Sequence, residues 1–205
     1  SHPMKTSEME LIIRPFSAST DNGNQYLVIH GDEAAVIDAG EDFEEIGKTL
    51  TREGVALKYL FVTHGHRAHM PALLALKGKF GGAFCMHPGD LDLLREPHEG
   101  LDPDLLVKDR QRLPLGGSEI RVLHTPGHTM GGLCFYVKSA DTLFSGNTLL
   151  KGKYGNIYGP NGMRLMMMSL RRLYNIMPPE TTVYPGQGPS TTFREEAWMF
   201  CLNSM

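Results

Sequence analysis

Histidines gather in two short stretches of this 205-residue chain, THGHRAH at 63–69 and HTPGHT at 124–129. Each stretch comes at the end of a run with the pattern of a strand, Tyr59–Thr63 in the first case and Glu119–His124 in the second. Both stretches are therefore expected in loops at strand ends. A fold that suits this chain has to hold several imidazoles beside its buried strands.

The spacing of three of these histidines favours a metal site. His64 and His66 are two positions apart, so on extended backbone their imidazoles point to the same side. His128 follows a rigid Pro126-Gly127 turn that can direct a third imidazole toward them. Three neutral nitrogen ligands with an open fourth position are what a catalytic zinc site requires. Four further histidines are expected to be hydrogen-bonded or exposed: His30, His87, His98 and His124.

Apolar periodicity predicts short strands that alternate with helices. Strands are predicted at Met9–Arg14, Gln25–Ile29, Ala34–Asp38, Tyr59–Thr63, Ala83–Met86, Glu119–His124, Leu133–Val137, Thr142–Ser145 and Thr182–Tyr184. Helices are predicted at Asp42–Arg52, His69–Phe80, Pro88–Leu94, Met163–Tyr174 and Ser190–Leu202, the last with Ser190 as its N-cap. The charged, proline-containing stretch Arg95–Gly117 is predicted to be a surface loop.

Composition narrows the class of protein. With 41% hydrophobic and 21% charged residues, the chain resembles an ordinary globular protein, and we expect one domain over residues 1–205, in which residues 1–3 look like a tag remnant. The net charge of −3 argues against a nucleic acid or a membrane as partner, and we expect a small-molecule substrate. The cysteines form no C-x-x-C pair, so reduced thiols and a cytoplasmic location are expected. The sequence does not indicate which oligomeric state the protein has.

Five motifs together carry a family resemblance. THGHRAH resembles the T-H-x-H-x-D-H signature of the metallo-β-lactamase superfamily, and HTPGHT resembles its second metal loop. IDAG at 37–40, LFSGNTLL at 143–150 and VYPGQGPSTT at 183–192 resemble further motifs of that family, in the same order. The likeness is closest to small glyoxalase II-like members. It implies an α+β fold, the αββα sandwich, with two mixed β-sheets face to face and helices outside.

Three positions depart from the family pattern. The resemblance assigns His64, His66 and His128 to a first metal ion, but Ala68 stands where a second-ion aspartate belongs. Asn147 replaces the aspartate that bridges both ions, and Gln187 replaces a late histidine. These changes remove two negative charges that would offset a second divalent ion in a partly buried pocket, where unbalanced charge costs several kcal/mol. We therefore expect at most one divalent metal per chain, preferably zinc and less readily iron, with a metal-free site as a further alternative.

The resemblance also suggests roles for the residues around the vacated half of the site. His69, Asn147 and Gln187 are expected to line it, with His69 as the nearest candidate base. Asp38 is expected either to support the site through hydrogen bonds or to form a plain strand-end turn. For Arg67, two interpretations stay open: it attracts an anionic substrate, or it points into solvent.

The preferred function is hydrolysis of an ester, thioester or amide by metal-bound hydroxide. The short stretch after Gln187 is not expected to hold the helical domain that binds glutathione in larger glyoxalases II, which makes a glutathione substrate less expected. One alternative is a catalytically silent, metal-poor relative that binds a ligand or partner. The other is a mononuclear iron oxidoreductase of the persulfide dioxygenase type, which would use a carboxylate where this chain has Asn147.

Overall fold

Two six-stranded sheets form the centre of the protein. The structure, a computed structural model, describes residues 10–17, 23–95 and 102–204. In the first sheet the strands follow chain order: β1 (Ile12–Ser17), β2 (Asn24–His30), β3 (Glu33–Ile37), β4 (Ala56–Phe61), β5 (Ala83–Met86) and β6 (Leu105–Leu106). The first three strands run antiparallel and the remaining pairs are parallel, so the sheet is mixed.

The second sheet is also mixed. Its order is β14 (Thr191–Thr192), β13 (Thr182–Pro185), β10 (Thr142–Gly146), β9 (Leu133–Val137), β8 (Ser118–His124) and β7 (Arg112–Leu115). Only the β10–β13 pair among these is parallel. A separate small hairpin joins β11 (Leu149–Leu150) to β12 (Lys153–Tyr154).

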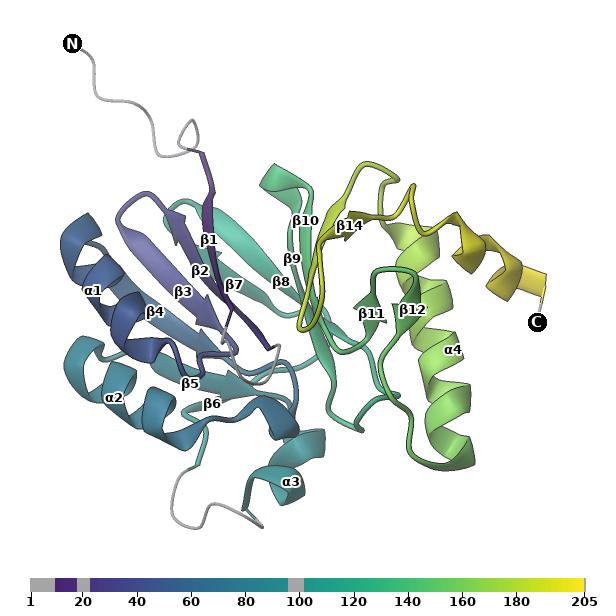
Figure 1. The fold of residues 1–205 in the computed structure, drawn as a ribbon, viewed down its shortest axis with the longest axis horizontal. Helices are drawn as coiled ribbons and strands as arrows, with labels where there is room; N and C mark the ends of the chain where they lie inside the picture. Colours follow the sequence, from purple (N-terminus) through teal and green to yellow (C-terminus); the bar gives the residue numbers. More distant parts are fainter. Residues whose placement is uncertain (1–9, 18–22, 96–101, 205) are drawn as a thin grey trace.

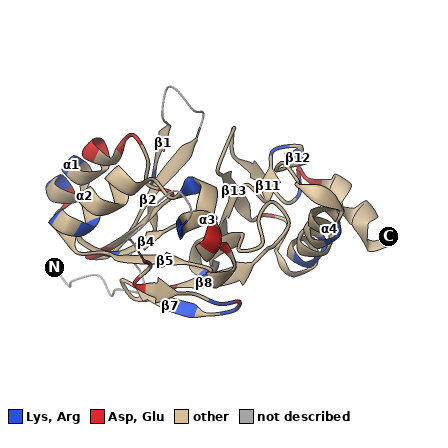
Figure 2. Ribbon diagram, turned by 90° about the horizontal axis from the view of Figure 1, so that it is seen from below, with Lys and Arg blue, Asp and Glu red and all other residues tan. Residues whose placement is uncertain are grey.

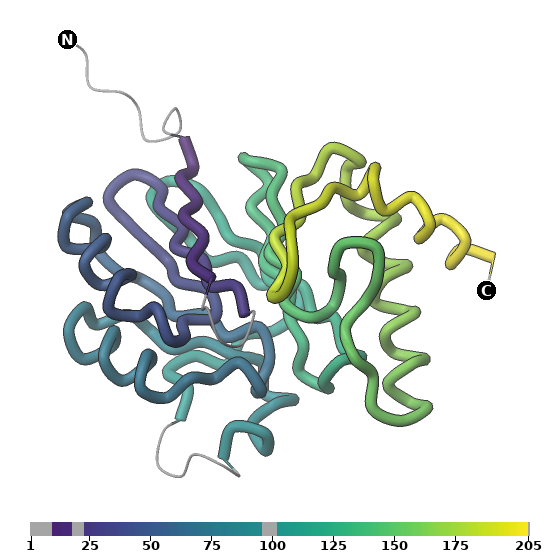
Figure 3. Tube along the Cα trace, in the orientation of Figure 1, coloured from purple at the N-terminus to yellow at the C-terminus, as the bar shows by residue number. Residues whose placement is uncertain are grey.

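Helices cover the outer face of each sheet, as Figure 1 shows. Helices α1 (Phe43–Glu53) and α2 (Met70–Phe80) pack on the first sheet, and α4 (Gly159–Ile176) packs on the second. The short α3 (Leu91–Arg95) lies below the first sheet in that view. In Figure 3 the purple-to-blue part of the tube makes one half of the molecule, and the green-to-yellow part makes the other. The predicted αββα sandwich, an α+β fold, is thereby confirmed.

The layers follow from the alternation of side chains along each strand. Leu27 of β2 points to the helices α1 and α2, whereas its neighbour Val28 points into the layer between the sheets. In that central layer Phe61 of β4 stacks on Phe135 of β9, with ring centroids 4.4 Å apart. Both faces of the first sheet are therefore buried, which explains why its strands read as nearly continuous apolar runs.

Two predicted segments differ from the structure. The stretch Arg95–Gly117 is not all loop, because β6 and β7 lie within it; residues 96–101 lie outside the described part. Pro114 is compatible with β7 because β7 is an edge strand, where a missing N–H is tolerated. The tight turn to β8 places Gly116 and Gly117 at φ angles of 53° and 87°, which favour glycine.

The predicted terminal helix Ser190–Leu202 is wrong, and Ser190 is not an N-cap. The structure has β14, a turn and then a 3-10 helix at Ala197–Ser204. The buried carboxylate of Glu196 accepts hydrogen bonds from the backbone N–H of Gly152 and the hydroxyl of Thr191, which holds this segment in its non-helical course. Tertiary contacts have overridden a helical pattern here.

Smaller differences concern element ends. The first strand runs over Ile12–Ser17 instead of Met9–Arg14, and Met9 lies outside the described residues. Cys85 and Cys134 are buried free thiols, whereas Cys201 is a free thiol on the surface. Among the described residues, no helix combines the length and the apolar character that a membrane span needs.

Candidate metal centre

His64, His66 and His128 come together between the two halves of the molecule. One ring nitrogen of each lies within 4.8 Å of the corresponding atoms of the other two. His64 follows β4 on extended backbone, and His66 lies in the 3-10 turn Gly65–Arg67. His128 lies in the loop after β8, with its ring centroid 4.7 Å from that of His64. His64 and His128 are buried and His66 is exposed, so the cluster is open on one side.

His64 is oriented by a hydrogen-bonded chain that starts at Asp38. The two oxygens of Asp38 accept from the backbone N–H of Thr63 (2.8 Å) and from its hydroxyl (2.7 Å). Because the Thr63 hydroxyl donates to Asp38, its oxygen accepts from Nδ1–H of His64 at 3.0 Å. The remaining nitrogen, Nε2, is then an unprotonated, buried atom without a hydrogen-bond partner. An unpaired buried lone pair of this kind is what a metal ligand presents.

Electrostatics keep His64 neutral. Burial lowers the pKa of His64 well below its ordinary value, and electrostatic interactions with His128, Arg67 and His66 lower it further. Neutral imidazole is the form that binds a metal. Burial raises the pKa of Asp38, whereas Arg67 and the two donor groups of Thr63 act in the opposite direction.

His128 has a similar arrangement. Its Nδ1–H donates to the backbone carbonyl of Asn156 at 2.6 Å, which leaves Nε2 with its lone pair. Burial lowers the pKa of His128, although the bond to Asn156 opposes this. The side-chain nitrogen of Asn147 lies 3.4 Å from Nε2 of His128, and the buried amide oxygen of Asn147 has no hydrogen-bond partner. Asn147 therefore borders the cluster, and its role there stays a prediction.

The buried carboxylate of Asp90 ties the two histidine loops together. It accepts from the backbone N–H of Gly65 (2.8 Å) on one side, and from the hydroxyl of Thr129 (2.7 Å) and the N–H of Gly131 (2.6 Å) on the other. The sequence does not single out Asp90, because it falls within the predicted helix Pro88–Leu94 and outside the five family motifs. Its role can be recognised only in the folded structure, where both histidine loops lie beside it.

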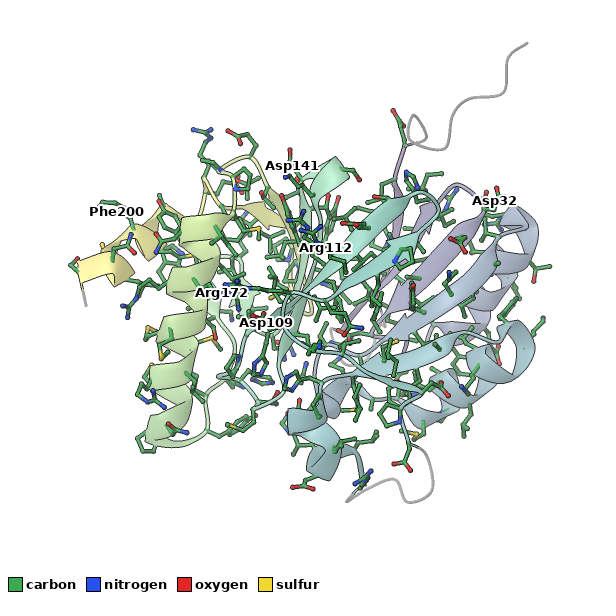
Figure 4. All side chains as sticks on the ribbon, turned by 180° about the vertical axis from the view of Figure 1, so that it is seen from behind. Asp32, Asp109, Arg112, Asp141, Arg172 and Phe200 are labelled. Carbon is green, nitrogen blue, oxygen red and sulfur yellow. The ribbon has the colours of Figure 1, made fainter. Side chains whose placement is uncertain are left out.

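The second loop is also fastened to α4. Asp109 accepts from the backbone N–H of His124 (2.9 Å) and pairs with Arg172 of α4 (2.9 Å); Figure 4 shows these two charged side chains together. The ring of His124 bonds to the carbonyl of Met130 (2.8 Å) and stacks on His87 at 3.9 Å. His124 and His87 are thus hydrogen-bonded structural residues, as is His30 through the Gly116 carbonyl. His98 lies outside the described residues.

The other half of the predicted site is arranged differently. His69 lines a small cavity of about 120 Å³ together with Asp38, Arg67 and Ala68. Nδ1 of His69 accepts from the backbone N–H of Ala72 (3.2 Å) and caps α2, so the neutral ring carries its proton on Nε2. In this tautomer Nε2–H of His69 can donate a hydrogen bond, while Nδ1 is engaged by the N–H of Ala72.

Gln187 is exposed and its backbone bridges to Gly23. Among the described residues its side chain forms no hydrogen bond with the histidine cluster, so its place in the site stays a prediction.

Arg67 does not point into solvent, and its attraction of an anionic substrate stays a prediction. Its guanidinium donates to the carbonyl of Gly186 (3.0 Å) and to that of Asn24 (2.9 Å), so it is tethered inside the protein. A Cβ at Gly23 would stand 2.9 Å from its nitrogens, which shows how closely the backbone packs against it. The charge acts on both Asp38 and His64, as their pKa values show. A fixed cation therefore stands beside the site.

Cavities around the cluster identify its accessible side. A cavity of about 610 Å³ is lined by His66 and His128 and opens toward α3 and α4. A larger hollow of about 930 Å³, lined by residues such as His30 and Ser118, lies away from the three histidines. The 610 Å³ cavity is therefore the candidate substrate site next to the histidine cluster.

Comparisons with known proteins agree with this geometry. The sequence profile of the Metallo-beta-lactamase superfamily matches residues 18–189, and the chain belongs to that superfamily. The hydroxyacylglutathione hydrolase of Pelagibacter ubique is 31% identical over 86% of this chain and 70% of its own length.

Two solved structures are similar over most of the chain. ETHE1 from Myxococcus xanthus has a TM-score of 0.77 and 26% identity, covering 90% of this chain and 81% of its own. TTHA1623 in a di-iron-bound form has a TM-score of 0.77 and 30% identity, covering 90% and 96%. The superfamily implies a divalent metal, and the unpartnered Nε2 of His64 and the lone pair of His128 fit one.

Proposed function

We propose that this protein is a hydrolase that binds one divalent ion, zinc in preference to iron, through His64, His66 and His128. Its substrates would be esters, thioesters or amides. The observation that carries the proposal is the Nε2 atom of His64, buried, neutral and without a partner, beside two further imidazoles. A zinc ion held by three imidazoles supplies a Lewis acid that polarises a carbonyl and lowers the pKa of a bound water to about 7.

The residues around the cluster would orient the reacting groups. The amide of Asn147 offers a donor nitrogen beside His128 and an unpartnered oxygen, so it can donate to a carbonyl oxygen or accept from water. Asp38, acting through Thr63, holds His64 in the tautomer that leaves Nε2 free. Because His69 carries its proton on Nε2, we assign it a donor role instead of the base role expected from the sequence.

A single ion is supported by the surroundings of the vacated half. Ala68 is buried and offers no ligand atom. Arg67 places a tethered positive charge next to Asp38, where a second divalent ion would meet an existing cation. Like charges in a partly buried pocket repel strongly, because the low local dielectric screens them little. Arg67 thus takes over part of the electrostatic role of a second metal.

The test is hydrolysis by protein loaded with one equivalent of zinc. The similarity to a hydroxyacylglutathione hydrolase makes thioesters the first class to assay, followed by esters and amides. We expect chelator-sensitive turnover that disappears in His128→Ala and persists in His87→Gln, a histidine outside the cluster. Absence of turnover by loaded protein over the whole panel would favour the catalytically silent alternative, which the changes at Ala68, Asn147 and Gln187 motivate.

A second candidate is an iron-dependent oxidoreductase of the persulfide dioxygenase type. The similarity to ETHE1 favours it, and TTHA1623 is a similar protein that holds iron, although as a di-iron form. Against it, Asn147 offers an amide at the position where that type uses a carboxylate. Oxygen uptake by iron-loaded protein in the presence of a thiol persulfide, with no hydrolysis by the zinc form, would support this candidate over the first.

A further inference from the structure

The 610 Å³ cavity next to the histidine cluster has a distinct chemical character. This volume is within the range of small-molecule sites, about 300–1,000 Å³. His66 and His128 form its inner end, and Leu93, Met130 and Tyr158 contribute apolar wall. The remaining lining comes mainly from glycines and from short polar residues. The cavity therefore joins the proposed metal centre to an apolar surface.

Two of these apolar side chains are unusually exposed. Tyr158 is 63% exposed and Met130 is 57% exposed. The ring of Tyr158 lies 6.1 Å from that of His66 and 5.8 Å from that of His128, between centroids, so it borders the metal ligands directly. Apolar surface left in water beside a metal centre contributes little to folding, but it gains free energy when an apolar ligand covers it.

The charges of the cavity point in the same direction. Within the described part of the chain, no lysine or arginine lines it. Its charged residues are Asp90, which is buried and engaged by three donors, and the exposed Asp92 of α3. Figure 2 shows acidic colour on α3 near the middle of the molecule in the view from below. Arg164 of α4 does not line the cavity, and its guanidinium donates hydrogen bonds to Asn161 and to the sulfur of Met168. An anionic group would find no cationic partner in this lining.

We propose that this cavity binds an uncharged, apolar chain of the substrate, such as the acyl chain of a neutral ester or thioester. This inference rests on the proposed hydrolase function, since the chain would extend from the carbonyl held at the histidines. It disfavours glutathione conjugates as substrates, because their carboxylates would lie next to Asp92. Leu93, Met130 and Tyr158 would cover the chain, and Asp92 would disfavour acidic ones.

The first experiment observes the cavity without metal or turnover. Methyl groups of methionine are labelled with ¹³C, and N-hexylacetamide is titrated against the protein, with 6-acetamidohexanoate as the matched probe whose chain ends in a carboxylate. We expect the Met130 methyl resonance to shift saturably with the neutral probe. The anionic probe should bind at least about tenfold more weakly, since a carboxylate is costly to desolvate. Met168, 52% exposed on α4 and outside the cavity, serves as the control in the same spectrum.

Variants define the outcome. Met130→Gln and Tyr158→Ala should each weaken binding of N-hexylacetamide several-fold, whereas Met168→Gln should leave it unchanged. Equal binding of both probes, no shift at Met130, or equal shifts at Met130 and Met168 would overturn the proposal.

A second experiment separates this inference from the proposed function. The zinc-loaded protein is assayed with p-nitrophenyl acetate, butyrate and hexanoate and with the half ester of adipic acid. We expect kcat/KM to rise by up to about fourfold per added methylene, the limit for full burial, and to fall for the acidic half ester. If Met130 responds but no ester is cleaved, the cavity assignment stands and the hydrolase proposal fails. If esters are cleaved without a chain-length preference, the cavity assignment fails.

Discussion

Substituting Asp90 by asparagine tests whether one buried carboxylate holds the two histidine loops in register. The amide oxygen of Asn can still accept from Gly65 and Thr129, but its NH₂ group then faces the N–H of Gly131, which donates to Asp90 at 2.6 Å. One buried donor is left unsatisfied, and two bonds lose their charge assistance. At about 1–3 kcal/mol for an unsatisfied buried group, we expect a total loss of about 2–4 kcal/mol in the free energy of unfolding.

Two measurements follow from that estimate. For a chain of this length, 2–4 kcal/mol lowers Tm by about 4–16 °C, which calorimetry of the metal-free protein detects. Since the same bonds fix Gly65 and Thr129, neighbours of His64, His66 and His128, zinc affinity should fall by about 10–100-fold in a chelator competition assay.

Asp92→Asn is the matched control. It removes the same charge two residues further on, at an exposed position, and should change stability by less than about 0.5 kcal/mol. If Asp90→Asn is as stable as Asp92→Asn, or binds zinc with unchanged affinity, the clamp between the loops does not exist in the form described.

Three further perturbations test other parts of the account. Restoring the family's second-site residues should leave the metal content, measured by elemental analysis, near one per chain while Arg67 is present. Adding Arg67→Met should raise this content toward two. An increase toward two without Arg67→Met would contradict the role given to the guanidinium. The restored positions are Ala68→Asp, Asn147→Asp and Gln187→His. Thr63→Val breaks the hydroxyl link to His64 and should weaken zinc binding by about 10–100-fold in calorimetric titration, with fold retained in circular dichroism. Burial, aided by His124, lowers the pKa of His87 from 6.5 to about 4, so the unfolded state binds the extra proton; stability should decline as pH falls below 6.5 and level off near 4. Denaturation at both ends of that range should show a smaller decline in His87→Gln.

The predictable part of the fold is the part governed by local pattern. The strands of the central layer and the helix α4 carry strong apolar periodicity, and their predicted positions agree with the structure to within a few residues. β7 is not predicted because its RLPL sequence is short and contains a proline, and the turn at Gly116 and pairing with β8 make it a strand. The terminal helix failed for a related reason: Glu196 is bonded to Gly152, 44 residues earlier in the chain, and β14 is held by pairing with β13.

The site divides along the same line. His64 and His66 could be identified from spacing alone, and His128 from its turn, because these signals are local. Asp90 lies 25 residues from Gly65 and 39 from Thr129, and its bonds to both appear only after folding. The orientation of the Arg67 side chain could not be predicted from the sequence either. Its hydrogen-bond acceptors are the backbone carbonyls of Gly186 and Asn24, which carry no sequence signature.

The central claim is one divalent ion held by three histidines, and native mass spectrometry of the zinc-exchanged protein measures it most directly. The account predicts a single zinc per chain at saturation, and none in a His64→Ala/His128→Ala variant that keeps its fold. Two ions per wild-type chain, or no bound ion in an excess of zinc, would contradict it.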